Sequence, residues 1–430
     1  MQFVLWLAIC AIINIFSGRR THVPIIVATT LLFCIPWVAA ELFTGVPSQG
    51  LGPIPSMHPG TWLILVTFVL RFFDGKHGVQ FVLKKYPVAF LTLGLFLLVA
   101  FAVTVVGGEL RGVGSLVYIF VCPIMLAILI MGENNKNLSF LTTLRNMVLV
   151  IAVAQGALGI AQYLTKSAIL FDAYYARQYW WSETISRSIG STDHPIMLSI
   201  LMCAGIALSV GLSNTALRIF LPLFFLLPVV CTGSRVGLIV AAVLVAWIVL
   251  AGPVGWITRI FLLGVLAGAV SLVLNGTIFK GAFGRFEDDS GSTRVRLLAY
   301  DLFGDVWPDY FFFGGGATHS YDLLETARLT TSFESAGLTY AVDYGVVPIF
   351  LYFLAMTTIA FTRIRSKKKG IPGSAVAFTA VFIQFQSYSG GTVQSSVASL
   401  LWLLVALSAC SLKSHPKSLP RNNCAQQVAP

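Results

Sequence analysis

A short polar turn, residues 232–235 (Thr-Gly-Ser-Arg), stands between two strongly apolar stretches of this 430-residue chain. A helix that begins directly after this turn would direct free backbone N–H groups, the Ser234 hydroxyl and the Arg235 guanidinium to one place. Helix N-termini and guanidinium groups both bind phosphate oxygens. The alternative is an arginine that only extends its charge to a membrane surface. The turn is therefore a candidate anion site.

Three further arginines can join this turn. Arg187 precedes the His194-Pro195 pair, and Arg294 and Arg296 stand at the start of an amphipathic stretch. Each one alone fits a solvated loop charge, but several guanidiniums on one side of a protein suit a diphosphate that leaves with two or more negative charges. We predict that a diphosphate is bound by the following residues: Arg187, Ser234, Arg235, Arg294 and Arg296.

Two residues are candidates for a general base, Glu334 and His319. Histidine titrates near neutral pH, and a partly apolar setting can bring glutamate toward it. The alternatives are an ordinary loop histidine and a carboxylate that stabilises a helix N-terminus. No metal site is predicted, because the acidic run 287–289 is typical of a solvated loop and the seven cysteines are scattered singly without CxxC spacing. No cofactor is predicted.

The composition determines which elements must position these residues. Apolar residues make up 57% of the chain, charged residues only 10%, and the mean hydropathy is +0.85. Soluble domains carry about 25% charged residues, so the sequence predicts an all-α membrane protein with about 12–14 transmembrane helices. The expected spans are 2–17, 23–40, 60–73, 87–106, 115–132, 146–165, 195–212, 217–231, 236–251, 260–279, 337–361, 374–388 and 396–412.

The positions of the charges predict the orientation. With the N-terminus outside, 18 of the 28 basic residues and two of the 17 acidic residues fall inside, a balance of +16. The outside then has 10 basic and 15 acidic residues, a balance of −5, and the two sides sum to the net charge of +11. Basic residues on the inner side are typical of multi-pass proteins of the cytoplasmic membrane. The basicity therefore reflects topology, not nucleic-acid binding, and the C-terminus is expected in the cytoplasm.

This threading divides the chain into six parts. They are N-terminal transmembrane helices (1–165), a first extracytoplasmic loop (166–194), helices with the Thr-Gly-Ser-Arg turn (195–279), a large extracytoplasmic loop (280–336), C-terminal transmembrane helices (337–412) and a cytoplasmic tail (413–430).

The larger loop is expected to carry a helix on the membrane surface. Within residues 294–307, Leu298, Leu302 and Val306 share one helical face, as in interfacial helices. The aromatic run 310–313 and the three glycines 314–316 that follow suggest a headgroup anchor with a hinge.

In combination, the motifs resemble the O-antigen ligase and polysaccharide polymerase superfamily. The turn 232–235, then Arg296, then glycines 314–316, then a polar motif before a helix with Gly345 occur in the order found there, and the segment 187–195 (RSIGSTDHP) is also similar. The likeness covers residues 187–360, and the N-terminal half agrees only in architecture.

The resemblance implies a metal-independent membrane glycosyltransferase with its site at the outer face of the cytoplasmic membrane. Such enzymes take a glycan from undecaprenyl diphosphate and pass it to another lipid-linked repeat unit (polymerases) or to lipid A core sugar (ligases). Arg235 and Arg296 would then bind the diphosphate. Ligases carry a His-Asn pair where this chain has Glu334-Ser335, and His319 lies fifteen residues earlier. This departure favours a polymerase, with the flippase and chain-length regulator of such pathways as candidate partners.

Two alternatives from other classes remain. A secondary transporter or flippase would use broken helices near the middle of the membrane, and several prolines interrupt the predicted spans. The spans nevertheless contain almost no charge away from their ends, and the two halves show no repeat. A scaffold for polysaccharide export would account for the aromatic loops but not for the arginines.

Overall fold

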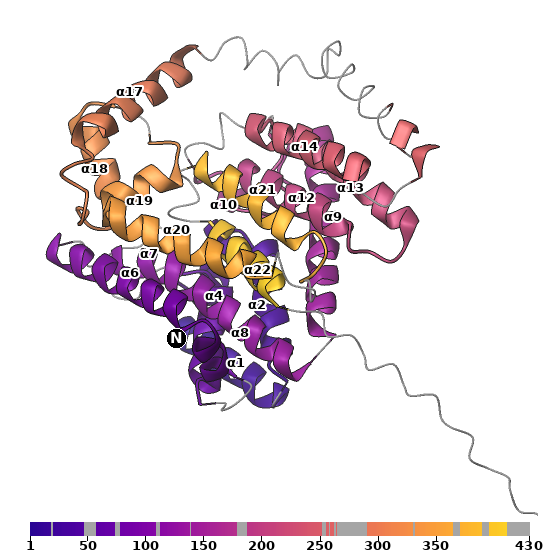
Figure 1. The fold of residues 1–430 in the computed structure, drawn as a ribbon, viewed down its shortest axis with the longest axis horizontal. Coiled ribbons are helices and arrows are strands. Elements are labelled where there is room, and N and C mark those ends of the chain that lie inside the picture. Colours follow the sequence, from indigo (N-terminus) through magenta and orange to yellow (C-terminus); the bar gives the residue numbers. More distant parts are fainter. Residues whose placement is uncertain are drawn as a thin grey trace, which may run out of the picture.

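The computed structural model describes the chain except for residues 19, 47–56, 74–77, 109–111, 138, 179–186, 252–254, 258, 262–263, 265–289, 330–331, 364–369, 389–394 and 411–430. In this described part every regular element is a helix (Figure 1). The N-terminal half has α1 (Gln2–Ser17), α2 (His22–Cys34), η1 (Trp37–Ala39), α3 (Glu41–Thr44), α4 (Pro59–Arg71), α5 (Val79–Lys85), α6 (Pro87–Val106), α7 (Gly112–Leu116), η3 (Val117–Val121), α8 (Cys122–Lys136) and α9 (Phe140–Thr165).

The rest has α10 (Asp172–Tyr175), α12 (Pro195–Ser209), α13 (Thr215–Cys231), α14 (Arg235–Ala251), α17 (Ser290–Val306), α18 (His319–Thr326), α19 (Ala336–Tyr344), α20 (Val346–Phe361), α21 (Ser374–Gln386) and α22 (Val397–Ala409). The all-helical class is therefore confirmed for the described residues. The expected span 260–279, the acidic run 287–289 and the tail from residue 413 lie largely or wholly outside them.

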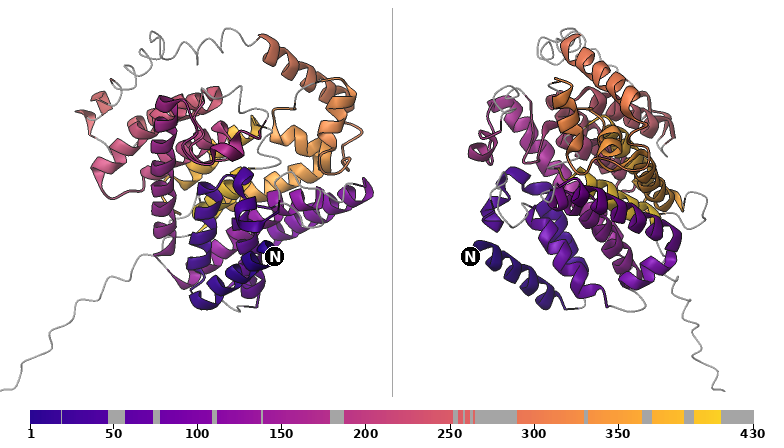
Figure 2. Two further views of the ribbon diagram at one scale, coloured as in Figure 1. Left: turned by 180° about the vertical axis from the view of Figure 1, so that it is seen from behind. Right: turned by 90° about the vertical axis from the view of Figure 1, so that its left-hand side faces the viewer.

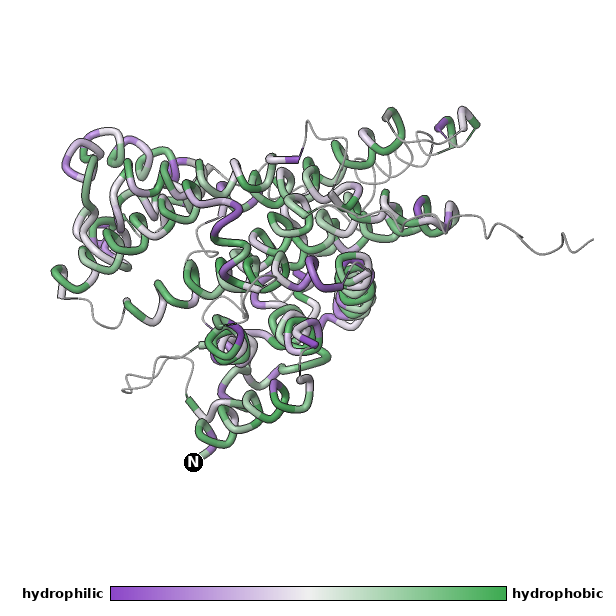
Figure 3. The backbone as a smooth tube through the Cα atoms, turned by 60° about the horizontal axis from the view of Figure 1, so that its bottom comes forward, coloured by the Kyte–Doolittle hydropathy of each residue, from purple (hydrophilic) through white to green (hydrophobic). Residues whose placement is uncertain are grey.

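Three of these helical segments are long and apolar enough to cross a membrane: α6, the continuous run Gly112–Lys136 and α9. A fourth crossing is possible through α2 with the segment Trp37–Thr44, which are bent by 105° at their junction. Eight further apolar helices are shorter, and apolar residues predominate along the helices (Figure 3). The expected span 23–40 is thus a broken helix, because the chain turns at Ile35 and Pro36.

Two of the short helices form the centre of the bundle. Every residue of α22, and all but one of α12, is buried. α22 packs on α8, and α12 packs on α9, α13, α14 and α21. A 13-residue helix is about 20 Å long, against about 30 Å for the hydrocarbon core. Because α22 is enclosed by other helices, protein rather than lipid covers its ends.

The expected single span 337–361 is broken at Gly345, where α19 ends and α20 begins. Gly345 has φ +106, in the region that favours glycine, and a Cβ there would lie 2.7 Å from the Phe312 carbonyl oxygen. The segment 310–316 satisfies the backbone on both sides of the break. The four N–H to carbonyl bonds are Val346 to Tyr310 (2.9 Å), Val347 to Phe311 (3.0 Å), Gly315 to Val342 (3.0 Å) and Gly316 to Asp343 (2.8 Å).

The glycines at 314–316 are therefore a packing contact, not the hinge that their sequence suggests. A Cβ on Gly314 would lie 2.2 Å from the Asp343 backbone, and one on Gly315 would lie 2.1 Å from the His319 ring. Gly315 also touches the end of α6, since a Cβ on Gly107 would lie 2.6 Å from its carbonyl oxygen. Close backbone approach requires glycine at these positions.

A helix, α17, is present where the surface helix was expected, and it lies at one edge of the molecule, away from the N-terminus (Figures 1 and 2). The chain that follows it exposes Trp307, Phe312 and Phe313. Phe312 and Phe313 belong to the segment 310–316, whose Gly315 packs on the end of α6, and most of α6 is not buried inside the protein. Aromatic side chains at the end of a spanning helix fit the interface of a bilayer.

Arginines predicted to face the cytoplasm have a structural role that needs no ligand. Four of them donate to carbonyl groups at or near the C-terminal ends of neighbouring segments, where the helix dipole is negative. The pairs are Arg71 with Gly18, Arg145 with Gly211, Arg218 with Leu212 and Arg363 with Ala409.

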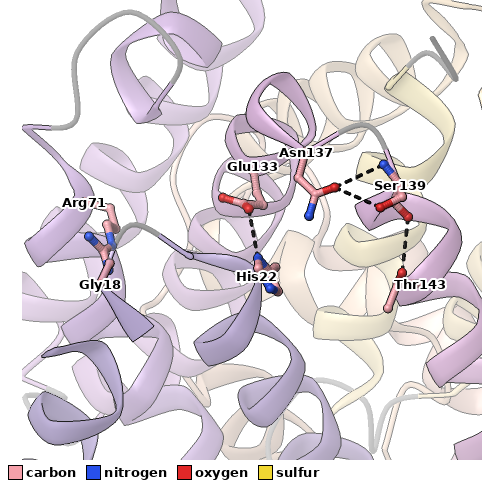
Figure 4. A network of polar contacts seen from close by, with 7 residues as sticks. All are labelled: Gly18, His22, Arg71, Glu133, Asn137, Ser139 and Thr143. Carbon is pink, nitrogen blue, oxygen red and sulfur yellow. Dashed lines mark hydrogen bonds and ion pairs between the residues drawn. The ribbon is translucent and has the colours of Figure 1, made fainter. Parts of the chain in front are cut away.

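Near the first of these pairs, His22 at the start of α2 lies 3.2 Å from the buried carboxylate of Glu133 (Figure 4). This contact lies at the N-terminal end of α2, whereas the bend at Ile35 and Pro36 follows the C-terminal residue of α2, Cys34.

The close packing of Gly314 predicts that Gly314→Ala destabilises the protein. The added methyl would displace the α19 backbone, which costs about 1–3 kcal/mol for overpacking. Gly304→Ala is the matched control, because a Cβ on Gly304, within α17, meets nothing within 4 Å. Thermal unfolding of the detergent-purified proteins should show a lower midpoint for Gly314→Ala and an unchanged or raised midpoint for Gly304→Ala. Equal midpoints would contradict the packing role.

Candidate functional site

Two glutamines of α9 hold the segment 189–191, which lies shortly before α12. The Gln162 Oε1 accepts hydrogen bonds from the N–H groups of Ile189 (3.1 Å) and Gly190 (2.8 Å), and its Nε2 donates to the Gly190 carbonyl (2.6 Å). The Gln155 Oε1 accepts from the Ser191 N–H (2.7 Å). All these side chains are buried or nearly so, so the loop has one fixed course.

Asp193 joins this loop to two other non-helical segments. Its Oδ1 accepts from the Trp37 N–H (2.6 Å), just after the bend that follows α2, and its Oδ2 accepts from the Ser396 N–H (2.9 Å), just before α22. Burial raises the pKa of this carboxyl to about 6, although the two N–H groups favour the charged form. Three segments distant in sequence thus meet at one carboxylate.

The structure brings Arg187 together with the Thr-Gly-Ser-Arg turn. The Arg187 Nε donates to the Thr232 carbonyl (2.7 Å), and the adjacent Ser188 N–H donates to the Cys231 carbonyl (3.0 Å). Gly233 has φ +62, and a Cβ there would lie 3.6 Å from the Arg187 Nε. The guanidinium therefore lies over the turn.

Ser234 and Arg235 begin α14. The Ser234 Oγ accepts from the Gly237 N–H (3.2 Å), as an N-cap does, and the residue is buried. Arg235 is the first helical residue and is partly exposed. Gly237 allows α14 to approach α12, because a Cβ there would lie 1.8 Å from the Ser199 Oγ. The predicted ligand Ser234 thus already has a structural role, and Arg235 is the cation that the turn presents.

A second group of charges lies around the start of α19. The Arg296 Nη2 of α17 lies 3.8 Å from the Glu334 Oε2, and both side chains are partly exposed. Glu334 has φ +50, which costs about 1–3 kcal/mol for a residue other than glycine. Ser335 then caps α19 by accepting from the Leu338 N–H (3.4 Å). The neighbouring Arg294 is exposed.

The other candidate base, His319, belongs to a different set of contacts. It is the first residue of α18, its Nε2 lies 3.0 Å from the Tyr310 hydroxyl, and its ring covers Gly315. These contacts tie His319 to the segment that crosses the α19–α20 break. Glu334 is the candidate base that pairs with an arginine.

Tyr388 is a further residue of this region, and no pattern in the sequence distinguishes it. It follows α21, is buried, and stacks on His194 with ring centroids 5.2 Å apart. Burial raises the pKa of its hydroxyl, the negative charges of Asp193 and Glu334 raise it further, and Arg187 lowers it. The charges of Arg187 and Glu334 are therefore both within electrostatic range of this hydroxyl.

His194 is fixed as a neutral side chain at physiological pH. Burial and the nearby Arg187 lower its pKa to about 3. Its Nδ1 accepts from the Ile196 N–H (3.2 Å), so the proton is on Nε2. His194 therefore acts as a hydrogen-bond donor and a stacking surface for Tyr388, and it does not titrate near neutral pH. His194 and Tyr388 are far apart in the sequence, so the His-Pro dipeptide does not predict their contact.

Among the residues that the structure describes, no group of three or more His, Cys, Asp or Glu side chains is placed to hold a metal ion. The six cysteines within this part are not paired in disulfides. What the arrangement offers instead is charge: Arg187 lies beside the turn from which Arg235 begins α14, and Arg296 lies beside Glu334.

The fold and this site define an all-helical protein with helices able to cross a membrane and a polar centre at the ends of several of them. No family model matches the chain, and no curated protein sequence is similar to it.

The Asp193 junction predicts that Asp193→Ala strongly destabilises the protein. Two buried backbone N–H groups would lose their acceptor, at about 1–3 kcal/mol each. The matched control is Asp172→Ala, which changes an exposed aspartate in α10. The thermal midpoint in detergent should fall by several degrees for Asp193→Ala and stay within about a degree for Asp172→Ala. If both variants have the same thermal midpoint, Asp193 does not hold these three segments together.

Proposed function

We propose that this chain is a glycosyltransferase of the cytoplasmic membrane that joins undecaprenyl-diphosphate-linked oligosaccharide repeat units at the outer face, as a polymerase of O-antigen, capsule or exopolysaccharide. The supporting observation is that the Arg187 guanidinium lies over the Thr-Gly-Ser-Arg turn at the start of α14, while Arg296 lies 3.8 Å from Glu334. The order of the motifs, which resembles that of the O-antigen ligase and polymerase superfamily, supports the same proposal.

In this proposal the arginines bind the donor diphosphate. Arg235 stands at the N-terminus of α14, where the helix dipole adds to its charge, and Arg187 is fixed beside it through the Thr232 carbonyl. Arg296 approaches from α17. Three guanidiniums held by separate elements stabilise the negative charge that develops on the diphosphate as it leaves.

Glu334 is the proposed base, and its ion pair with Arg296 links the two substrates. Diphosphate competes with the carboxylate for Arg296, so donor binding releases Glu334 to accept a proton. The acceptor hydroxyl oxygen then bonds to the anomeric carbon, the bond from that carbon to the diphosphate oxygen breaks, and the proton passes to Glu334. A single displacement of this kind inverts the configuration at the anomeric carbon.

Two other functions compete with this proposal. An O-antigen ligase would carry out the same displacement on a lipid A core acceptor; the glutamate at the place of the ligase histidine favours the polymerase. A transporter is favoured by the 105° bend after α2 and by the break at Gly345, since broken helices often form transport sites. Elongation of lipid-linked oligosaccharide by purified protein without an ion gradient would distinguish an enzyme from a transporter.

Replacing the donor-binding arginines should abolish long polysaccharide chains. We expect Arg235→Ala and Arg296→Ala to lose about 100-fold or more in turnover, the usual effect of removing one group that stabilises a leaving anion. Arg235→Lys should recover part of the activity. The control is Arg259→Ala, which removes an exposed arginine outside the predicted site. Chain lengths are measured by gel electrophoresis in a host that lacks its own copy; normal long chains in the Arg235 variants would refute the diphosphate site.

The choice of base is tested separately. Glu334→Gln keeps the size of the side chain but cannot take up a proton, and we expect at least a 100-fold loss of turnover. His319→Ala should retain most of the activity, because the contacts of His319 are with Tyr310 and Gly315. The opposite result, an active Glu334→Gln and an inactive His319→Ala, would assign the base to His319.

A further inference from the structure

The last residue of α21, Gln386, has a buried donor that the described part of the protein does not use. Its Nε2 is inaccessible to solvent and has no hydrogen-bond partner there. A buried amide N–H without an acceptor costs about as much as a lost hydrogen bond. A buried amide N–H without an acceptor, next to a proposed reaction site, is a candidate for ligand binding, because a ligand oxygen can accept its hydrogen bond.

A second glutamine of the same helix provides the contrast. Gln384 lies two residues earlier, and its amide is satisfied inside the bundle: the Oε1 accepts from the Ser199 hydroxyl (3.3 Å) and the Nε2 donates to the Ala380 carbonyl (3.4 Å). Gln384 is therefore part of the packing between α12 and α21. The side-chain amide of Gln384 therefore has hydrogen-bond partners, whereas the Nε2 of Gln386 has none in the described part of the protein.

The position of Gln386 relates it to the proposed base. Its Oε1 packs against the first turn of α19, where a Cβ on Gly337 would lie 2.6 Å from it. Gly337 is three residues after Glu334, and Gln386 is two residues before Tyr388, whose hydroxyl is affected by the Glu334 charge. The amide thus lies at the helix start that presents Glu334, separate from the Thr-Gly-Ser-Arg turn.

We propose that Gln386 and Glu334 form the binding subsite for the acceptor sugar, in which the Gln386 Nε2 donates to an uncharged sugar oxygen and holds the reacting hydroxyl against the Glu334 carboxylate. This inference rests on the proposed function. The amide forms no bond to the reacting atoms: the acceptor oxygen bonds to the anomeric carbon, the diphosphate leaves, and the proton goes to Glu334. Gln386 is a positioning residue, whose contribution appears in the binding of the acceptor.

The test uses an acceptor that cannot serve as a donor. The methyl glycoside of the host's repeat-unit oligosaccharide lacks the diphosphate, so its KM reports the acceptor subsite alone, and the undecaprenyl-diphosphate repeat unit is the donor. In purified full-length protein we expect Gln386→Leu, which keeps the bulk but not the amide, to raise the acceptor KM about tenfold, equivalent to about 1.4 kcal/mol. The donor KM should stay within twofold.

A second variant moves the amide without removing it. The methyl group of Gly337→Ala would meet the end of the flexible Gln386 side chain and displace it, so the acceptor KM should again rise while the unfolding midpoint stays unchanged. Ser387→Ala is the control, because the Ser387 hydroxyl donates within its own helix, to the Gln384 carbonyl (3.0 Å). It should leave both KM values unchanged.

The outcomes separate this inference from the proposed function. If Arg235→Ala is inactive but Gln386→Leu has the wild-type acceptor KM, the subsite is refuted and the glycosyltransferase remains. If Gln386→Leu raises donor and acceptor KM equally, or lowers only the unfolding midpoint, its role is structural and the inference is again refuted. If the wild-type protein elongates neither the methyl glycoside nor the lipid-linked repeat unit, the polymerase proposal fails, and the subsite with it.

Discussion

Backbone polar groups inside an apolar bundle have no water to bind, so each place where a helix breaks needs a partner from within the protein. This chain meets that requirement in two ways. Side chains of α9 and the carboxylate of Asp193 bind the loop 187–194 and the segments beside it. The segment 310–316 binds the two helix ends at Gly345. Most of the candidate site residues lie on or directly beside these helix breaks, whose backbone groups are hydrogen-bonded within the protein.

This constraint explains how two distant loops form one centre. Arg187 has a fixed place because the residues after it are bound to α9 and to the end of α13. Glu334 has a fixed place because it directly precedes α19, and α19 is bound to the segment 310–316. The tertiary structure therefore determines the relative positions of a cation and a carboxylate that are 147 residues apart (334 − 187).

The sequence predicted most of the helices because a long apolar run has few alternatives in a bilayer. The range of α6 agrees with its expected span at both ends. The breaks after α2 and at Gly345 were missed, since each is a short interruption of an apolar run that only tertiary partners stabilise. The arginines and Glu334 could be selected by residue type and position. Tyr388 and Gln386 could not, because an aromatic ring and an amide near a helix end have no distinctive pattern, and their neighbours come from other parts of the chain.

The attachment of the segment 310–316 has a consequence for how such a protein can diversify. The segment is joined to α19 and α20 by main-chain hydrogen bonds and by glycines in close contact, so the attachment depends little on the identity of neighbouring side chains. Side chains of α17 and α18 that face away from this junction can therefore change without altering the main-chain frame.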